Sequence, residues 1–388
     1  MLRGTLGPLP DVPRIREQGD GPTHRPCSRP AAAEQVSKLR TGEKKTVNTG
    51  RQSVEWLYRQ LQVDDDWAIR TLNGFKWWAD KNAQTVEVLG EEAAPDGDIG
   101  YWISVRTQFL RDVDLTDHQV AGIRALLMPF AAMAGPVYDA KTRTVDLCSL
   151  VRVHQDISTG LNPLISVAAV LQIGEVSIMA SEVAKALHVN DATSGHPKHG
   201  MRPRPDEMAG VIASLIVPLG QQPSKWSATE FHDAVDKYMQ QPPSLGATAG
   251  DTGCTVEFPY GDHSSLCQMM SDQPHPRYGN GLFQLQSFPV SPMSDAEGTR
   301  LGLSLNATEL AEKPSGYGFG SYVYRDGSVY FTSFLPNAAH RAGLLPSLYY
   351  SSASRARAMS LRFTDHDWTE ESFDLSRSSM MRAARLRR

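Results

Sequence analysis

The residues best suited to chemistry lie in one polar segment, residues 188–206. His196 and His199 stand three positions apart there. Other possible metal ligands lie nearby: His188, Asp191, Asp206 and Glu207. Imidazole and carboxylate groups suit zinc, so a metal site is one interpretation. The segment is rich in Pro and Gly, however, whereas paired histidines bind zinc best from a rigid helix. We therefore expect no functional metal site, with His196 and His199 as weak candidates.

The cysteines give no second metal motif. The spacings of Cys254, His263, Cys267 and His275 match no familiar zinc finger or knuckle, so packing and loop positions explain them better. Cys27 and Cys148 are equally isolated, and the start of the chain lacks the apolar core of a signal peptide. No stretch reaches the roughly 18 apolar residues of a membrane span. These features predict a cytoplasmic protein with reduced thiols and no membrane span.

Motifs for phosphate binding and acyl transfer are also missing. Gly316, Gly318 and Gly320 precede an expected strand, whereas a phosphate cradle opens a helix and is followed by Lys-Ser/Thr. We interpret them as a bend before an aromatic strand. The chain has no G-x-S-x-G nucleophile motif. The sequence thus predicts no catalytic residue and no cofactor, although a triad assembled from distant residues would leave no such motif.

The elements that would position a site begin with a helix over residues 53–63, capped by Ser53. Two strands follow, and residues 99–110 alternate as a strand with one buried face. A helix capped at Thr116 or Asp117, a hairpin and a long apolar helix over residues 161–187 complete the series. The order is α-β-β-β-α-β-β-α, which is typical of an α+β fold with a mostly antiparallel sheet.

The same order recurs in the second half. A helix begins at Ser227, the Asp326-Gly327 turn predicts a hairpin, and residues 341–361 form the closing helix. We therefore expect two similar domains, residues 51–190 and 227–365, joined by a linker with a short helix over residues 191–226. An internal duplication would pack them as a pseudo-dimer. Two unrelated α+β domains are the alternative.

Charge is distributed unevenly along the 388 residues, whose net charge is −4. Residues 1–50 are basic and lack periodic apolar residues, so we expect a disordered arm. Residues 366–388 form a basic tail, which we interpret as a solvated end, although an acidic partner, a membrane surface or RNA could also bind it. The remaining body is acidic. This charge argues against a nucleic-acid groove on the body, because phosphate binding needs a positive face.

The element order resembles the type III secretion chaperone fold and the related YbjN-like proteins. The resemblance covers residues 53–187 and 227–361, and so two fused copies. It implies a non-enzymatic, acidic and usually dimeric protein that holds an extended segment of a client protein along its helices and sheet edges. From this resemblance we expect a protein-binding chaperone, either as a monomeric pseudo-dimer or as a homodimer.

Four aromatic residues are candidates for the partner-binding surface. Strand alternation places Trp78 and Trp102 among polar neighbours, and Trp is enriched at protein interfaces. Tyr330 and Phe334, on either side of Thr332, present the same pattern in the second half. Alternatively, a helix or the other half of the chain covers these aromatic residues, and they do not face a partner. The alternative function is an enzyme or a small-molecule or metal-binding sensor in the cleft between halves, with the His-rich linker as a lid.

Overall fold

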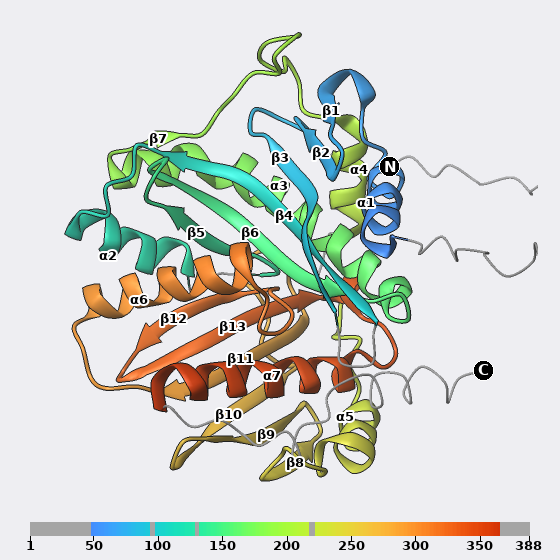
Figure 1. Cartoon of the computed structure of the whole chain (residues 1–388), viewed down its shortest axis with the longest axis vertical. Helices are drawn as coiled ribbons and strands as arrows, with labels where there is room; N and C mark the ends of the chain where they lie inside the picture. The colour runs from blue at the N-terminus through green and yellow to red at the C-terminus, as the bar shows by residue number, and fades with distance from the viewer. Residues whose placement is uncertain (1–47, 94–97, 129–131, 217–221, 365–388) are drawn as a thin grey trace, which may run out of the picture. The chain divides into compact units, whose positions relative to one another are not determined.

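Each half of the chain builds one antiparallel sheet with helices against it (Figure 1). The computed structural model describes residues 48–93, 98–128, 132–216 and 222–364, so most of the expected arm and the whole basic tail lie outside the description. The first half contains α1 (Thr49–Gln60), η1 (Asp65–Trp67), β1 (Ala68–Arg70), β2 (Gly74–Trp77), β3 (Gln84–Ala93), β4 (Ile99–Arg111), α2 (Asp117–Leu126), β5 (Gly135–Asp139), β6 (Thr144–Val153) and α3 (Ser158–Leu187).

The linker carries β7 (Asn190–Asp191) and α4 (Glu207–Ile216). The second half contains α5 (Ala228–Ala234), η3 (Val235–Met239), β8 (Gly246–Gly250), β9 (Gly253–Tyr260), β10 (His263–Met270), β11 (Gly281–Pro289), α6 (Asp295–Ala307), η4 (Thr308–Glu312), β12 (Ser321–Arg325), β13 (Ser328–Pro336), η5 (Asn337–Ala339) and α7 (Leu344–Thr364). The prediction of an α+β fold with antiparallel sheets is confirmed.

The two sheets share one strand order. The first runs β1-β2-β3-β4-β6-β5, with β7 paired to the end of β4, and the second runs β12-β13-β11-β10-β9-β8. Each is therefore a four-stranded meander followed by a hairpin. Each half has one strand more than the sequence predicted, β1 and β8. The Gly, Ala and Thr residues of β8 carry no alternating apolar pattern, so the sequence alone predicts a loop there.

Helix α1 begins earlier than expected. Asn48, not Ser53, is the N-cap, because its side chain accepts a hydrogen bond from the Arg51 N–H at 2.9 Å. Ser53 lies inside the helix and is buried. Thr116 caps α2 and Ser227 caps α5, as the sequence predicts, and Ser294 caps α6; each of the three forms a capping box.

The inner faces of both sheets contribute to one hydrophobic core. In the first half α1 and α3 pack on β4, and in the second α7 packs on β9 and β11. Leu57 and Ile165 belong to the same buried cluster as Phe331 and Leu348. The residues expected to form two domains thus lie in one compact unit. Helix α3 is long and apolar enough to cross a membrane, but 67% of its apolar window is buried in the fold, as in the core helix of a soluble protein.

A buried glutamine joins sheet to closing helix in each half. Gln84 donates its amide N–H to the Ala169 carbonyl of α3, and Gln286 donates to the Ser352 carbonyl of α7, both at 2.9 Å. Gln84 and Gln286 are completely buried. Because a buried polar group without a partner is costly, these bonds fix how each helix lies on its sheet. The two glutamines lie in strands that do not correspond, β3 and β11, so each half fixes its closing helix from a different strand.

Candidate binding surface and the junction between the halves

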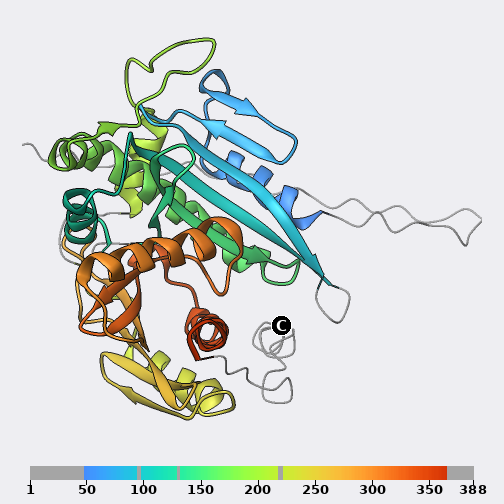
Figure 2. The ribbon, with the colours of Figure 1, turned by 60° about the vertical axis from the view of Figure 1, so that its left-hand side comes forward.

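The junction is built from the same elements of both halves. Helix α6 packs on β5 and lies beside α2 (Figures 1 and 2). Arg124 of α2 forms an ion pair with Asp295 at the start of α6, at 2.5 Å. In return, Arg300 of α6 pairs with Asp117 at the start of α2, at 3.0 Å. These exposed pairs contribute little energy, but each joins an arginine of one helix to the aspartate at the start of the other.

The edges of the two sheets also meet at the junction. Asn306 on α6 donates to the Pro136 carbonyl of β5 at 2.9 Å and accepts from the Tyr322 N–H of β12 at 2.8 Å. Gly318 lies against β6 and donates its N–H to the Leu150 carbonyl at 3.0 Å. A Cβ on Gly318 would meet that carbonyl oxygen at 2.6 Å. The glycine-rich segment from Gly316 to Gly320 therefore forms a contact between the two halves, which we call the seam. The two backbones approach so closely there that glycine is required.

A titratable group lies buried at this junction. Glu175 of α3 accepts a hydrogen bond from the Tyr278 hydroxyl at 2.8 Å, and the Arg277 guanidinium is 3.9 Å away. Burial raises the pKa of Glu175 to about 7, although Tyr278 and Arg277 partly oppose the rise. Glu175 and Arg277 line a cavity of about 10 Å³. That volume holds about one water molecule, so the cavity is too small for a substrate in this conformation.

Replacing Glu175 by glutamine is expected to remove a pH dependence of stability. Because the pKa of Glu175 is higher in the folded state than its ordinary 4.5, the native protein loses stability as pH rises from about 4.5 to about 7. The loss is about 3 kcal/mol. Urea unfolding of both proteins across this range should show it in the native protein only. Exposed Glu182 on the same helix provides the control Glu182→Gln, which should retain the native slope.

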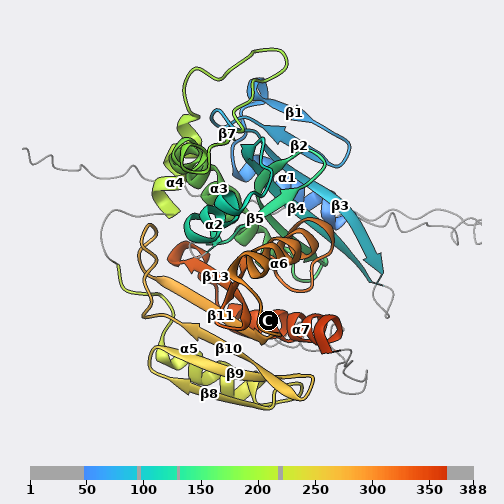
Figure 3. The ribbon, with the colours of Figure 1, turned by 90° about the vertical axis from the view of Figure 1, so that its left-hand side faces the viewer.

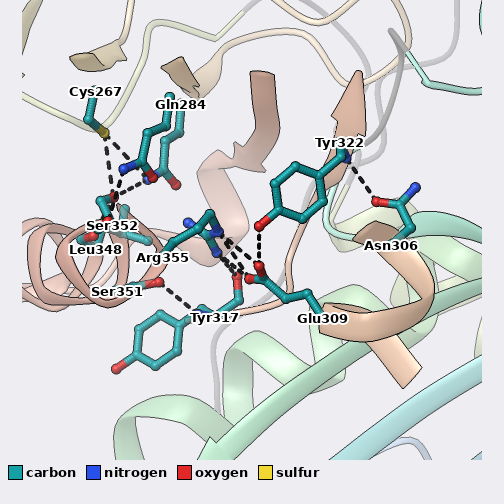
Figure 4. Close-up of polar contacts among 11 residues, drawn as sticks. Cys267, Gln284, Asn306, Glu309, Tyr317, Tyr322, Leu348, Ser351, Ser352 and Arg355 are labelled. Carbon is teal, nitrogen blue, oxygen red and sulfur yellow. Dashed lines mark hydrogen bonds and ion pairs between the residues drawn. The ribbon is translucent and has the colours of Figure 1, made fainter. Parts of the chain in front are cut away.

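The second half contains a buried ion pair beneath α7 (Figure 4). Arg355 is completely buried and contacts Glu309 of η4 at 2.7 Å. It also donates to the Tyr317 carbonyl at 2.9 Å and lies 3.5 Å from the centre of the Phe331 ring. The Tyr322 hydroxyl donates to the same carboxylate. Because this network is enclosed and its charges are paired, it fixes η4 and β12 against α7 and does not face a substrate.

The described cysteines are not poised as nucleophiles. Cys148, Cys254 and Cys267 are buried and form no disulfide. Burial raises the pKa of Cys254 to about 12 and also raises the pKa of Cys148 and Cys267, so the thiols stay protonated. Cys27 lies outside the described residues. Among the residues that the structure describes, no group of three or more His, Cys, Asp or Glu side chains could hold a metal ion.

One face of the second sheet, whose strands lie side by side from β13 to β8 in Figure 3, carries partly buried apolar residues. Along β10 and β11 alternate residues are buried toward α5 and α7, and the others are half-exposed. Register places Leu285 opposite Gln268 and Thr332, and Tyr330 opposite Ser287 and Val323. We call the partly buried apolar residues of this face the outer patch: Leu266, Met270, Phe283, Leu285, Val323 and Tyr330.

The two second-half candidates lie on this outer face, but only one is accessible. Tyr330 and Phe334 alternate with core residues of β13, as the sequence indicated. Tyr330 is half-exposed. Phe334 is only 1% exposed, because His275 of the β10–β11 loop packs on its ring at 5.0 Å between centroids. Phe334 is therefore buried and not partner-facing in this conformation, which corrects the expectation for this residue.

The two first-half candidates also differ. Trp102 is half-buried, and its ring lies over Gly90, where an added Cβ would meet it at 3.1 Å. Trp78 is only 2% exposed, because the linker covers it: its indole N–H donates to Ser194 at 3.2 Å and its carbonyl accepts from Arg202 at 2.7 Å. The expectation that Trp78 faces a partner is corrected, since a linker distant in sequence fills that face.

His196 and His199 occur together but without further ligands. Their rings stack at 4.9 Å between centroids, and His196 is buried against Trp67 and Trp78. The sequence signal that we missed is a repeat: His196-Pro-Lys-His-Gly200 recurs as His275-Pro-Arg-Tyr-Gly279.

Comparison of the chain with protein-family models, with curated proteins and with solved structures finds no match.

Proposed function

We propose that the protein is a cytoplasmic, non-enzymatic protein-binding protein that holds a client protein in the manner of a secretion chaperone. The observation that carries this proposal is the outer patch, a partly exposed apolar and aromatic sheet face. Contiguous apolar patches on soluble proteins mark interaction sites. Tyr330 is the aromatic anchor of this surface, and Trp102 is a second contact on the first half. The enclosed ion pair and the buried thiols offer no comparable support for catalysis.

We further infer that the halves form a pseudo-dimer inside one chain. The shared strand order and the Arg124 and Arg300 ion pairs between α2 and α6 support this inference. In a two-fold interface each element meets its own counterpart, as α2 meets α6 and β5 meets β12. On this account duplication created two equivalent outer faces that then diverged. The second carries six partly buried apolar residues beside Glu257 and Gln268, whereas the first carries charged groups such as Lys76, Arg106 and Asp146.

An acidic substitution in the outer patch should abolish client binding without unfolding the protein. We expect Leu285→Asp to lose the partner that the native chain captures from its own cytoplasm at a fixed stoichiometry in native mass spectrometry. The reason is the cost of burying an unpaired carboxylate in an apolar interface. Because Leu285 is half-exposed, the free energy of unfolding should fall by no more than about 1–2 kcal/mol.

The matched control is Ile178→Asp on α3. Ile178 is also an apolar residue in contact with solvent, 72% exposed, but it lies away from the outer patch. It should retain the partner at the native stoichiometry. If Leu285→Asp captured as much of the partner protein as the native chain does, the outer patch would not be the binding surface. A native chain that carries only a small ligand would favour the sensor or enzyme alternative.

A further inference from the structure

The two copies of the His-Pro-x-aromatic-Gly sequence form the same loop. His196 and Gly200 exchange both backbone hydrogen bonds, at 2.7 and 2.8 Å, and His275 and Gly279 do so at 2.8 and 3.0 Å. Both glycines have positive φ, +72° and +67°. The first and fourth side chains stack in each loop, at 4.9 Å for His196 and 4.7 Å for His275. The sequence repeat is thus a structural repeat.

An inner hydrogen bond makes both loops depend on a neutral histidine. The Lys198 N–H donates to Nδ1 of His196 at 3.3 Å, and the Arg277 N–H donates to Nδ1 of His275 at 3.1 Å. Only an unprotonated ring nitrogen can accept. Protonation of His196 therefore converts its Nδ1 from an acceptor into a donor that faces the Lys198 N–H. The loops differ at the fourth position, where His199 replaces the Tyr278 of the second loop.

The first loop lies in a segment that buries Trp78 and packs against the partly exposed Trp67. We call residues 192–206 the strap. Ser194 bonds the Lys81 carbonyl at 2.9 Å and the Trp78 indole at 3.2 Å, and Asp206 bonds the Ala79 carbonyl at 2.7 Å. His196 sits at the centre, with the Trp78 ring 5.1 Å away and the Trp67 ring 6.0 Å away. The covering of these tryptophans therefore depends on the loop around His196.

We propose that the strap is a pH-sensitive latch, in which protonation of His196 breaks the loop and uncovers Trp67 and Trp78. The proposal stands on the loop geometry and goes beyond the binding function, because it concerns access to a different face of the molecule. In the closed state the neutral His196 ring accepts the Lys198 N–H and packs between the two indoles. A charged ring in the closed state would be buried beside neighbours that repel it, so protonation favours the open state.

The charges around His196 oppose its protonation. On the strap, Lys198 and His199 adjoin it, and Arg202 lies 5.1 Å from the Trp67 ring, paired with Asp64 and Asp206 at about 3 Å. From β2, the Lys76 ammonium lies 5.1 Å from the Trp78 ring. Burial, then His199, lowers the pKa of His196 below its ordinary 6.5. Because the folded pKa is depressed, the latch is fully stable above pH 6.5 and weakens as pH falls.

Hydrogen exchange of the intact protein tests the latch. We expect the bonded amides of Ser194, His196 and Gly200 to exchange at least about tenfold faster at about pH 5 than at about pH 7.5, after correction for the intrinsic rate. His196→Asn should abolish the acceleration, because an Asn side chain accepts the same i+2 N–H without titrating. His199→Tyr, which copies the second loop, should make the acceleration smaller, because removing one repulsive neighbour brings the folded pKa of His196 closer to its ordinary value.

The amides of β9 and β10 serve as an internal reference for general acid unfolding. Equal protection of the strap at both pH values would overturn the latch, as would an undiminished acceleration in His196→Asn. Either result would leave the outer patch proposal intact, because client capture by Leu285→Asp is measured separately at neutral pH. Conversely, failure of the capture experiment would not affect the exchange result.

Discussion

Replacing Arg355 by alanine is expected to lower the free energy of unfolding by about 3–5 kcal/mol, the largest effect of any substitution considered. Arg355 is completely buried, and its removal leaves the Glu309 carboxylate without its charged partner in a water-free site. Tyr322 alone would still donate to that carboxylate. Urea unfolding monitored by circular dichroism gives the difference directly, and the variant should also melt at a markedly lower temperature.

Two further variants separate charge from packing at this site. Arg355→Met combined with Glu309→Gln removes both charges and should recover much of the loss, because the uncompensated carboxylate is then absent. Arg362→Ala on the same helix removes an exposed arginine and should change stability by less than about 0.5 kcal/mol. A loss in Arg355→Ala no larger than in Arg362→Ala would contradict the enclosed ion pair.

The second large effect is expected at the seam. Gly318→Ala should destabilise the protein by about 1–3 kcal/mol, because the new Cβ would lie 2.6 Å from the Leu150 carbonyl oxygen and 2.9 Å from a Leu310 methyl group. The backbone bond from Gly318 to Leu150 would have to lengthen. Thermal unfolding should show the loss, and hydrogen exchange should show faster opening at β6 and β12.

Gly174→Ala on α3 is the matched control for this substitution. A Cβ there meets no atom within 4 Å, and the residue is inside a helix. Alanine should therefore stabilise the helix by up to about 1 kcal/mol. If both variants were equally stable, the close contact at Gly318 would be relieved by a small backbone shift, and the seam would not depend on glycine.

The alternation of residues along each strand predicted which face of the sheet a side chain lies on. It did not predict which other segments pack on that face. Alternation correctly placed Tyr330, Thr332 and Phe334 on one side of β13. It could not show that a loop bearing His275 would bury Phe334, or that the strap would bury Trp78, because those contacts join segments distant in sequence. Two of the four predicted surface residues are therefore buried by segments distant in sequence. The pattern within a single strand contains no information about those contacts.

Elements with weak local patterns were the ones missed. The strand β8 has small residues without alternation, and the start of α1 depended on the Asn48 side chain, which competes with Ser53 as a cap. The repeated His-Pro-x-aromatic-Gly sequence, by contrast, was visible in the chain. Aligning its two copies would have indicated one loop conformation, since Pro and Gly at fixed positions restrict the backbone.

The most direct test of the central proposal asks what touches the outer patch in the cell. A photoreactive amino acid at position 285 should cross-link one protein through one extended peptide, identified by mass spectrometry after digestion, whereas the same amino acid at position 178 should not. This difference would place a client segment on the sheet face. The same diffuse products at both positions, or none at position 285, would contradict the account.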